Sequence, residues 1–159
     1  MKIMLDKGAK MPTRAHTYDA GLDLYTPVDV LIPGCKIKMG LWEMVKRLFI
    51  GWSIPIDIGS QTIDTGVHVQ IPEGMVGLIK SKSGLNVKSG LTGEGVIDAH
   101  YTGSVKVKLY NHTRYPHFFH AGEKIAQLLV IPCSLPRPDL VDRLEETDRG
   151  DGGFGSTGR

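Results

Sequence analysis

Glycine and proline interrupt this chain so often that it has no room for long helices. Twenty glycines and nine prolines are distributed over 159 residues. Between them lie short apolar and β-branched runs, such as the alternating segments 67–71 and 104–110 and the nearly continuous apolar segment 124–131. Period-two alternation with frequent turn residues is typical of many short strands. The sequence therefore predicts an all-β sandwich or barrel.

Composition narrows the class of protein further. With 41% hydrophobic residues, a chain of this length can bury the core of one domain. The 19 basic and 17 acidic residues are too evenly balanced for a general nucleic-acid coat. Cys35 and Cys133 form no CxxC pair, as expected in a reducing cytoplasm. No signal peptide or membrane span is apparent, so we expect a cytoplasmic protein that binds neither membranes nor nucleic acid.

Residues 34–60 depart from the strand pattern. Five apolar side chains recur there at helical spacing: Leu41, Met44, Val45, Leu48 and Trp52. Glu43, Lys46 and Arg47 fall on the other side of the same helix. We predict a short amphipathic helix, with an irregular hairpin as the alternative.

The C-terminal segment 149–159 contains five glycines in eleven residues and is expected to form a mobile arm. Its exposed N–H groups, together with Arg149, Ser156 and Thr157, are suited to surround phosphate oxygens. Phe154 is suited to stack on a base when such an arm closes. The alternative is a solvated tail with no binding role.

Three further positions are candidates for chemistry. Segment 80–85 holds two lysines, two serines and a glycine, which indicates an anion site or, alternatively, an ordinary solvated turn. Asp98 follows two β-branched residues and is a candidate base or, alternatively, a turn cap. Gln127 interrupts an apolar strand, where its amide needs a partner from a ligand phosphate or a backbone group.

Together these segments follow the order of five motifs of the trimeric dUTPase (deoxyuridine triphosphate nucleotidohydrolase) family, which the chain resembles. The matching segments are 20–24, 82–85, 95–103, 121–128 and 149–158. The resemblance spans nearly the whole chain apart from residues 34–60. Five ordered motifs are far more specific than any single glycine pattern.

The resemblance implies a jelly-roll β domain over residues 1–148 and an arm, 149–159, that closes over an active site. It implies a homotrimer with three active sites at the subunit interfaces, each built from all three chains. The implied reaction is hydrolysis of dUTP to dUMP and pyrophosphate, with Mg²⁺ holding the triphosphate. Such an activity limits uracil incorporation into DNA and supplies dUMP for thymidylate synthesis.

Roles for individual residues also follow from the resemblance. Asp98 would activate the attacking water, Tyr101 would pack under the deoxyribose and exclude a 2′-hydroxyl, and Asp23 would contact Mg²⁺ through water. A hairpin at 92–98 would recognise uracil through backbone groups, chiefly those of Gly95, Val96 and Ile97. Contacts with the phosphates are implied for Lys82, Ser83, Gly84 and Gln127. From the arm, binding is implied for Arg149, Gly155, Ser156 and Thr157, and stacking on uracil for Phe154.

Three features depart from the family pattern. Lys82 replaces the usual arginine, which keeps the charge but loses the planar guanidinium fork. Thr92 stands where the uracil hairpin commonly carries asparagine. Residues 34–60 replace a short connection by a stretch well beyond the usual ~4–6 residues of a loop.

The inserted segment 34–60 has three interpretations. It covers its own subunit's core, extends the trimer interface, or presents an apolar patch to a protein partner. Lys46 and Arg47 are few basic residues for a membrane-surface helix. The alternative function is accordingly a dUTPase-fold regulator that binds another protein through 34–60. A deaminase of related fold is disfavoured, because 105–109 lacks the glutamate that those enzymes need.

Overall fold

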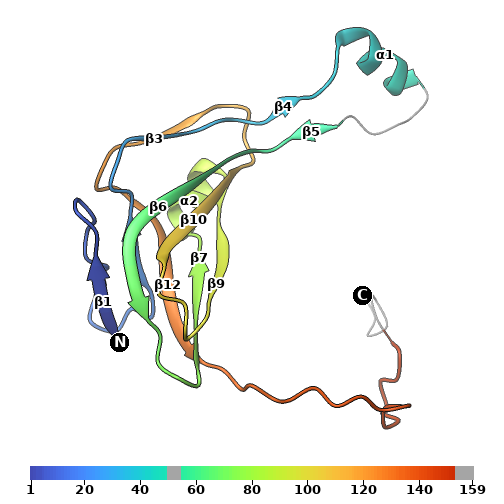
Figure 1. The fold of residues 1–159 in the computed structure, drawn as a ribbon. Coiled ribbons are helices and arrows are strands. Elements are labelled where there is room, and N and C mark those ends of the chain that lie inside the picture. Colours follow the sequence, from blue (N-terminus) through green and yellow to red (C-terminus); the bar gives the residue numbers. More distant parts are fainter. Residues whose placement is uncertain (50–54, 153–159) are drawn as a thin grey trace.

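The computed structural model describes residues 1–49 and 55–152, and these form an all-β jelly roll with two short helices (Figure 1). The first of its two four-stranded sheets has the order β1 (Lys2–Leu5), β6 (Gly59–Gln70), β10 (Ser104–Asn111), β8 (Leu91–Thr92). The second has the order β2 (Leu22–Tyr25), β12 (Lys124–Pro132), β7 (Met75–Lys80), β9 (Glu94–Ile97). All their pairings are antiparallel. The predicted all-β class is confirmed.

The core lies between the two sheets, and alternation along the strands builds it. In β10, Val105, Val107 and Leu109 are buried while the intervening Lys106 and Lys108 are exposed. This follows from the two-residue period of a strand, which turns successive side chains to opposite faces. The second sheet contributes further buried side chains, among them Leu24, Ile79, Ile125, Ala126 and Leu128. Burial of these side chains stabilises the arrangement of both sheets.

Residues 36–49 and 55–57 form a projection whose two arms are paired strands. β4 (Lys36–Ile37) pairs with β5 (Ile56–Asp57), and α1 (Leu41–Phe49) lies beyond them. The pair carries α1 away from both sheets (Figure 1). The predicted amphipathic helix is confirmed for its described residues, and Trp52 lies outside them.

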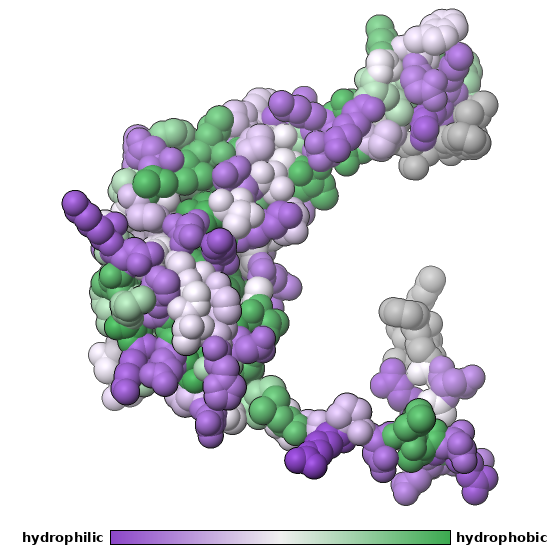
Figure 2. Space-filling view, viewed as in Figure 1, coloured by the Kyte–Doolittle hydropathy of each residue, from purple (hydrophilic) through white to green (hydrophobic). Residues whose placement is uncertain are grey.

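α1 does not cover the core. None of its residues is buried, and Figure 2 shows hydrophobic and hydrophilic surface on a helix that stands apart from the domain. The interpretation that the segment covers its own subunit's core is therefore wrong for α1, because the β4–β5 pair holds the helix at a distance. A role at a subunit interface or toward a protein partner stays a prediction.

A pair of short strands and a second helix complete the domain. β3 (Val30–Ile32) pairs with β11 (His117–Phe119), and α2 (Ser83–Ser89) follows β7. After β12 the chain leaves the body as an extended segment (Figure 1). Of the helices in the described ranges, neither is long and apolar enough to cross a membrane.

Candidate active site

Three of the five motifs meet at one end of the second sheet. β12 lies between β2 and β7, and the register places Gln127 opposite both Asp23 and Lys80. Lys82 follows β7 by two residues, so it reaches the same end. The segments 20–24, 82–85 and 121–128, which are far apart in the sequence, therefore contribute to one site.

Asp23 is the centre of this site. It is only 4% exposed, and its carboxylate forms ion pairs with two lysines. Lys124 Nζ lies 2.7 Å from Oδ2, and Lys82 Nζ contacts Oδ1. Burial raises the pKa of Asp23, but hydrogen bonds and charges from Lys124 and Lys82 lower it more, so the pKa lies below its ordinary value. Asp23 also raises the pKa of Lys124.

Replacing this carboxylate by an amide is expected to destabilise the protein in a pH-dependent way. Asp23→Asn leaves both lysines without an anion and should lower the free energy of unfolding by about 2 kcal/mol at pH 7. Because the pKa of Asp23 is depressed in the folded state, its carboxylate makes its full contribution to stability above the pKa of the same group in the unfolded chain, about 3.9. It is lost as the pH falls through the folded pKa. Urea unfolding of both proteins at one concentration, across this pH range, measures the difference.

A matched control for this variant is Asp57→Asn. The Asp57–Lys38 pair, 3.2 Å long, is exposed on both sides and should contribute less than about 1 kcal/mol. An equal loss in both variants, or a loss for Asp23→Asn that does not change with pH, would contradict the assignment of Asp23 as a buried ionic centre.

Gln127 connects the first, second and fourth motifs. Its Nε2 donates a hydrogen bond of 3.2 Å to the Ser81 carbonyl oxygen. A Cβ on Gly21 would lie 2.3 Å from Gln127 Oε1, so a side chain at that position would move the amide from its present place. The expected partner is thus a backbone group for Nε2, and the predicted contact with a phosphate stays a prediction.

The second motif is partly helical, which the sequence did not indicate. The ordinary turn considered as the alternative for 80–85 is wrong, because Lys80 belongs to β7 and α2 begins at Ser83. Tertiary contacts stabilise this short helix, because Leu85 packs against the core. The C-cap Gly90, at φ 61°, supplies the left-handed terminus. Gly90, a residue type typical of the position after a helix, was the one signal that could have located the end of α2.

Gly84 is not required by packing within the chain. An added Cβ there would meet no atom within 4 Å, and Gly84 is not among the glycines with positive φ. Ser83 beside it is exposed. The surface above the start of α2 therefore has open space next to Lys82.

Asp98 lies far from these residues within the same chain. β9 pairs with β7 so that Ile97 is opposite Gly77 and Glu94 is opposite Lys80. Asp98 thus follows one end of β9, while Lys82 follows the other end of β7. The two positions are separated by six residues along the strands, or about 20 Å at ~3.3 Å per residue. One chain does not bring the predicted base and the predicted phosphate-binding lysine together.

The loop that carries Asp98 is held in a compact turn. The Tyr101 N–H donates to the Asp98 carbonyl oxygen at 3.1 Å, and the Tyr101 hydroxyl donates to the Ser104 carbonyl oxygen at 2.9 Å. A Cβ on Gly103 would lie 2.5 Å from that hydroxyl, so the ring can fold over the loop only above a glycine. The Asp98 side chain is exposed and forms no hydrogen bond with a described residue. The turn-cap alternative is therefore wrong for the carboxylate, because the backbone carbonyl makes the turn.

Segment 92–98 crosses between the two sheets. The hairpin expected there is wrong, because β8 pairs with β10 in the first sheet and β9 pairs with β7 in the second. The chain changes sheets at Gly93, where a Cβ would lie 2.8 Å from the Lys108 carbonyl oxygen.

β9 is the edge strand of its sheet among the described strands, so one row of its backbone groups is unpaired within the sheet. The side chain of Ile97 is buried in the core, whereas Val96 is exposed and Gly95 is half-buried. Of Ile97, only the backbone and not the side chain is therefore available to a ligand. Hydrogen-bonding groups along this edge can pair with a flat polar molecule.

The remaining predicted residues lie outside this arrangement. Arg149 Nε donates to the Gly152 carbonyl oxygen at 3.0 Å, in the extended segment beyond β12. This segment extends away from both sheets of its own chain (Figure 1). Four candidates lie outside the described residues: Phe154, Gly155, Ser156 and Thr157.

The side chains available as metal ligands decide what kind of magnesium site is possible here. Mg²⁺ prefers six oxygen ligands and usually keeps several waters. The described residues contain no cluster of three or more His, Cys, Asp or Glu suited to a metal, and the Asp23 carboxylate already pairs with two lysines. These residues fit a Mg²⁺ ion that a triphosphate carries into the site better than one held in a side-chain cage.

Comparisons with known proteins extend over most of the chain. The dUTPase family model matches residues 52–158. The deoxyuridine 5′-triphosphate nucleotidohydrolase of Corynebacterium jeikeium is 40% identical over 164 residues, which cover 98% of this chain and 90% of that protein.

Solved structures agree with this match. A Staphylococcus bacteriophage 80alpha dUTPase mutant with dUpNHpp has a TM-score of 0.79 and 27% identity, covering 99% of this chain and 98% of that one. The dUTPase of phage phi11 of S. aureus, whose structure describes the coordination of a structural Mg(II) ion, has a TM-score of 0.71 and 25% identity. That match covers 91% of this chain and 98% of that one.

Proposed function

The chain belongs to the dUTPase family and hydrolyses dUTP to dUMP and pyrophosphate, and from this premise we propose how its residues carry out the reaction. The activity removes dUTP, which limits uracil incorporation into DNA, and it supplies dUMP for thymidylate synthesis. The observation that supports the mechanism most strongly is the accessible carboxylate of Asp98, which has no partner among the described residues.

Asp98 acts as the general base. Hydrolysis of a polyphosphate depends chiefly on the position of the nucleophile and on neutralisation of charge. A carboxylate that is free of internal ion pairs can accept a hydrogen bond from the attacking water and then its proton. Tyr101, folded over the same loop, packs under the deoxyribose and leaves no space for a 2′-hydroxyl.

Lys82, Ser83, Gly84 and Gln127 bind the phosphates. Lys82 supplies positive charge, and the shared partner Asp23 holds its ammonium group in place. Lys124 pairs with the same carboxylate and adds a second positive charge, a role that was not predicted from the sequence. Mg²⁺ bound to the triphosphate neutralises further charge on the phosphate oxygens. Asp23 approaches that ion only through water, since both of its oxygens contact lysines.

Uracil is recognised by the backbone of segment 92–98. The unpaired edge of β9 offers N–H and C=O groups, and Gly95 allows close approach of a flat ring. A base held in this way is selected by its hydrogen-bonding pattern, and a narrow site excludes the methyl group of thymine.

The active protein is a homotrimer whose sites are shared between chains. Lys82 and Asp98 of one chain are about 20 Å apart by the strand geometry, so a site that needs both must take them from different chains. The segment 133–152, beyond β12, extends away from both sheets of its own chain (Figure 1). We assign residues 149–159 to an arm attached to the jelly-roll domain 1–148. That arm closes over a site of the assembly.

A substrate panel tests this function. We expect pyrophosphate release with Mg²⁺ from dUTP, with a kcat/KM at least about 100-fold above that for UTP, dTTP or dCTP. Comparable turnover of UTP would contradict the role of Tyr101. Comparable turnover of dTTP or dCTP would contradict uracil recognition by segment 92–98.

Neither the family model nor the curated relatives support the alternative of a regulator that binds another protein through 34–60. A protein partner for that segment stays a prediction, since α1 exposes Leu41, Trp42 and Phe49. Such binding should be lost on deletion of 34–60 with turnover retained. We also place the protein in the cytoplasm, or in the host cytoplasm for a viral source, because both cysteines are free thiols.

A further inference from the structure

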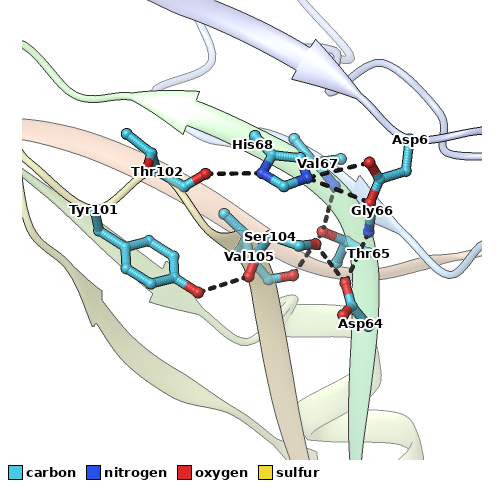
Figure 3. A network of polar contacts seen from close by, with 10 residues as sticks. All are labelled: Asp6, Asp64, Thr65, Gly66, Val67, His68, Tyr101, Thr102, Ser104 and Val105. Carbon is cyan, nitrogen blue, oxygen red and sulfur yellow. Dashed lines mark hydrogen bonds and ion pairs between the residues drawn. The ribbon is translucent and has the colours of Figure 1, made fainter.

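A histidine outside the five motifs contacts the loop that carries Asp98. His68 lies in β6, opposite Met4 of β1 and Ser104 of β10. Its Nδ1 is 2.8 Å from the Thr102 carbonyl oxygen, and its Nε2 is 3.3 Å from both carboxylate oxygens of Asp6 (Figure 3). The side chain is only 19% exposed. His68 therefore connects the N-terminal strand region to the 98–104 loop.

Both partners of His68 accept hydrogen bonds and cannot donate them. A neutral imidazole has one N–H group, so it can satisfy the Thr102 carbonyl or Asp6, but not both. Only the imidazolium, with two N–H groups, matches both acceptors. The hydrogen bond to Thr102 and the bond to Asp6 accordingly raise the pKa of His68 and outweigh partial burial.

The charged surroundings of His68 come from every neighbouring element. Asp6 follows β1, and its own N–H donates to the Gly66 carbonyl oxygen at 2.8 Å, which holds it in place. Asp64 of β6 adds negative charge, and Lys106 of β10 partly offsets it. Lys2 of β1 lines the same cavity as His68. Negative charge at closest range favours the protonated ring.

The contact with Thr102 is the loop's attachment to the sheet. Among the described residues, His68 is the one side chain outside 98–104 that hydrogen bonds to 98–103. The bonds of Tyr101 to Asp98 and Ser104 lie within the loop. Behind it, Ser104 Oγ contacts Asp64. Without His68, the stretch that carries Asp98 is held by its own turn, by its connection to β9 and by the packing of Ala99 against the core.

We propose that protonated His68 is a positioning residue for dUTP hydrolysis, which holds the Asp98 loop through the Thr102 carbonyl and holds it less firmly when the ring loses its proton. The inference rests on the proposed role of Asp98. Below the pKa of His68 the imidazolium holds both acceptors. Above that pKa the ring has a single N–H for two acceptors, so the Thr102 carbonyl and Asp6 compete for it. The attachment of the loop then weakens and Asp98 is less well placed.

The first test is a titration of the full-length protein with ¹⁵N-labelled histidine, followed by NMR. We expect His68 to titrate above the ordinary imidazole value of about 6.5, with both ring nitrogens protonated below its midpoint. Asp6→Asn removes the anion but keeps an acceptor oxygen, so it should lower the midpoint. A midpoint at or below about 6.5, or one that Asp6→Asn leaves unchanged, would overturn the inference.

The second test compares kcat as a function of pH in the parent and in His68→Gln. Glutamine can donate one hydrogen bond to Thr102 but does not titrate. The kcat of the parent divided by the kcat of His68→Gln is a ratio from which ionisations shared by both proteins cancel. We expect this ratio to fall by about tenfold as the pH rises through the His68 midpoint, because small misplacement of a catalytic group is costly.

Control variants keep this test decisive if His68→Gln folds poorly. Asp6→Asn retains the ring and should move the alkaline fall in kcat to lower pH, in step with the NMR midpoint. His120→Gln removes a 73% exposed ring, 3.9 Å from Asp29, that does not touch the loop, and it should match the parent. A pH-independent ratio, or a fall unrelated to the NMR midpoint, refutes the positioning role. Full activity in Asp98→Asn would instead refute the proposed base, while the titration still reports on His68.

Discussion

Asp98→Asn is expected to give a folded protein that binds the substrate and releases pyrophosphate about 10³-fold more slowly. The amide keeps the size of the side chain but cannot accept the proton of the attacking water. The Asp98 side chain has no hydrogen bond to a described residue, so its replacement removes no internal contact there. The measurement is kcat for pyrophosphate release at saturating dUTP with Mg²⁺.

Binding and stability measurements separate this chemical role from a structural one. The affinity for the non-hydrolysable analogue dUpNHpp, measured by calorimetry, should change little in Asp98→Asn. Asp57→Asn, an exposed aspartate of β5 in the projection, is the matched control and should keep the parent kcat. Substantial turnover by Asp98→Asn would exclude Asp98 as the base. A loss of kcat that is accompanied by a marked loss of unfolding free energy would show that the substitution acts through the fold.

Two inactive variants are expected to restore activity to each other when their chains are mixed. Asp98→Asn lacks the base, and Lys82→Ala lacks a phosphate-binding charge, so each assembly alone should be nearly inactive. If a site takes Lys82 from one chain and Asp98 from another, chains assembled at random in equal amounts contain both groups at about a quarter of the sites. Co-refolding the two variants and measuring pyrophosphate release tests this expectation.

The double variant Lys82→Ala with Asp98→Asn provides the control. Mixed with an equal amount of the parent chain, it should retain about a quarter of the activity if sites are shared, and about half if each site lies within one chain. Mixtures of the two single variants that never exceed the sum of the separate activities would contradict shared sites. The strand register, which separates Asp98 from Lys82 along β7 and β9, favours recovery.

Local patterns in the sequence predicted much of the fold. Alternation in segment 104–110 correctly predicted which side chains of β10 are buried, because the two-residue period of a strand requires no knowledge of its partners. Helical spacing in 41–48 correctly predicted α1 for the same reason. α2 was missed because its seven residues show no apolar periodicity, and contacts of Leu85 with the core stabilise it.

Long-range contacts were not predictable in the same way. The sequence identified Asp23 as a candidate next to magnesium, but it did not indicate that Lys82 and Lys124 both pair with its carboxylate. His68 was not singled out at all, since a histidine in an alternating strand is unremarkable until Thr102 and Asp6 are seen beside it. The hairpin expected at 92–98 was wrong because the choice of sheet depends on the partners of β8 and β9.

The sequence by itself determined the all-β class and the dUTPase family, and it indicated candidate residues for the chemistry, because alternation, glycine content and motif order are local properties of the chain. Only the tertiary structure decided how these residues are distributed. It grouped Asp23, Lys82 and Gln127, separated them from Asp98, and attached the Asp98 loop to His68. The physical reason is strand register: it is set by packing between residues far apart in the chain, and it fixes which side chains become neighbours.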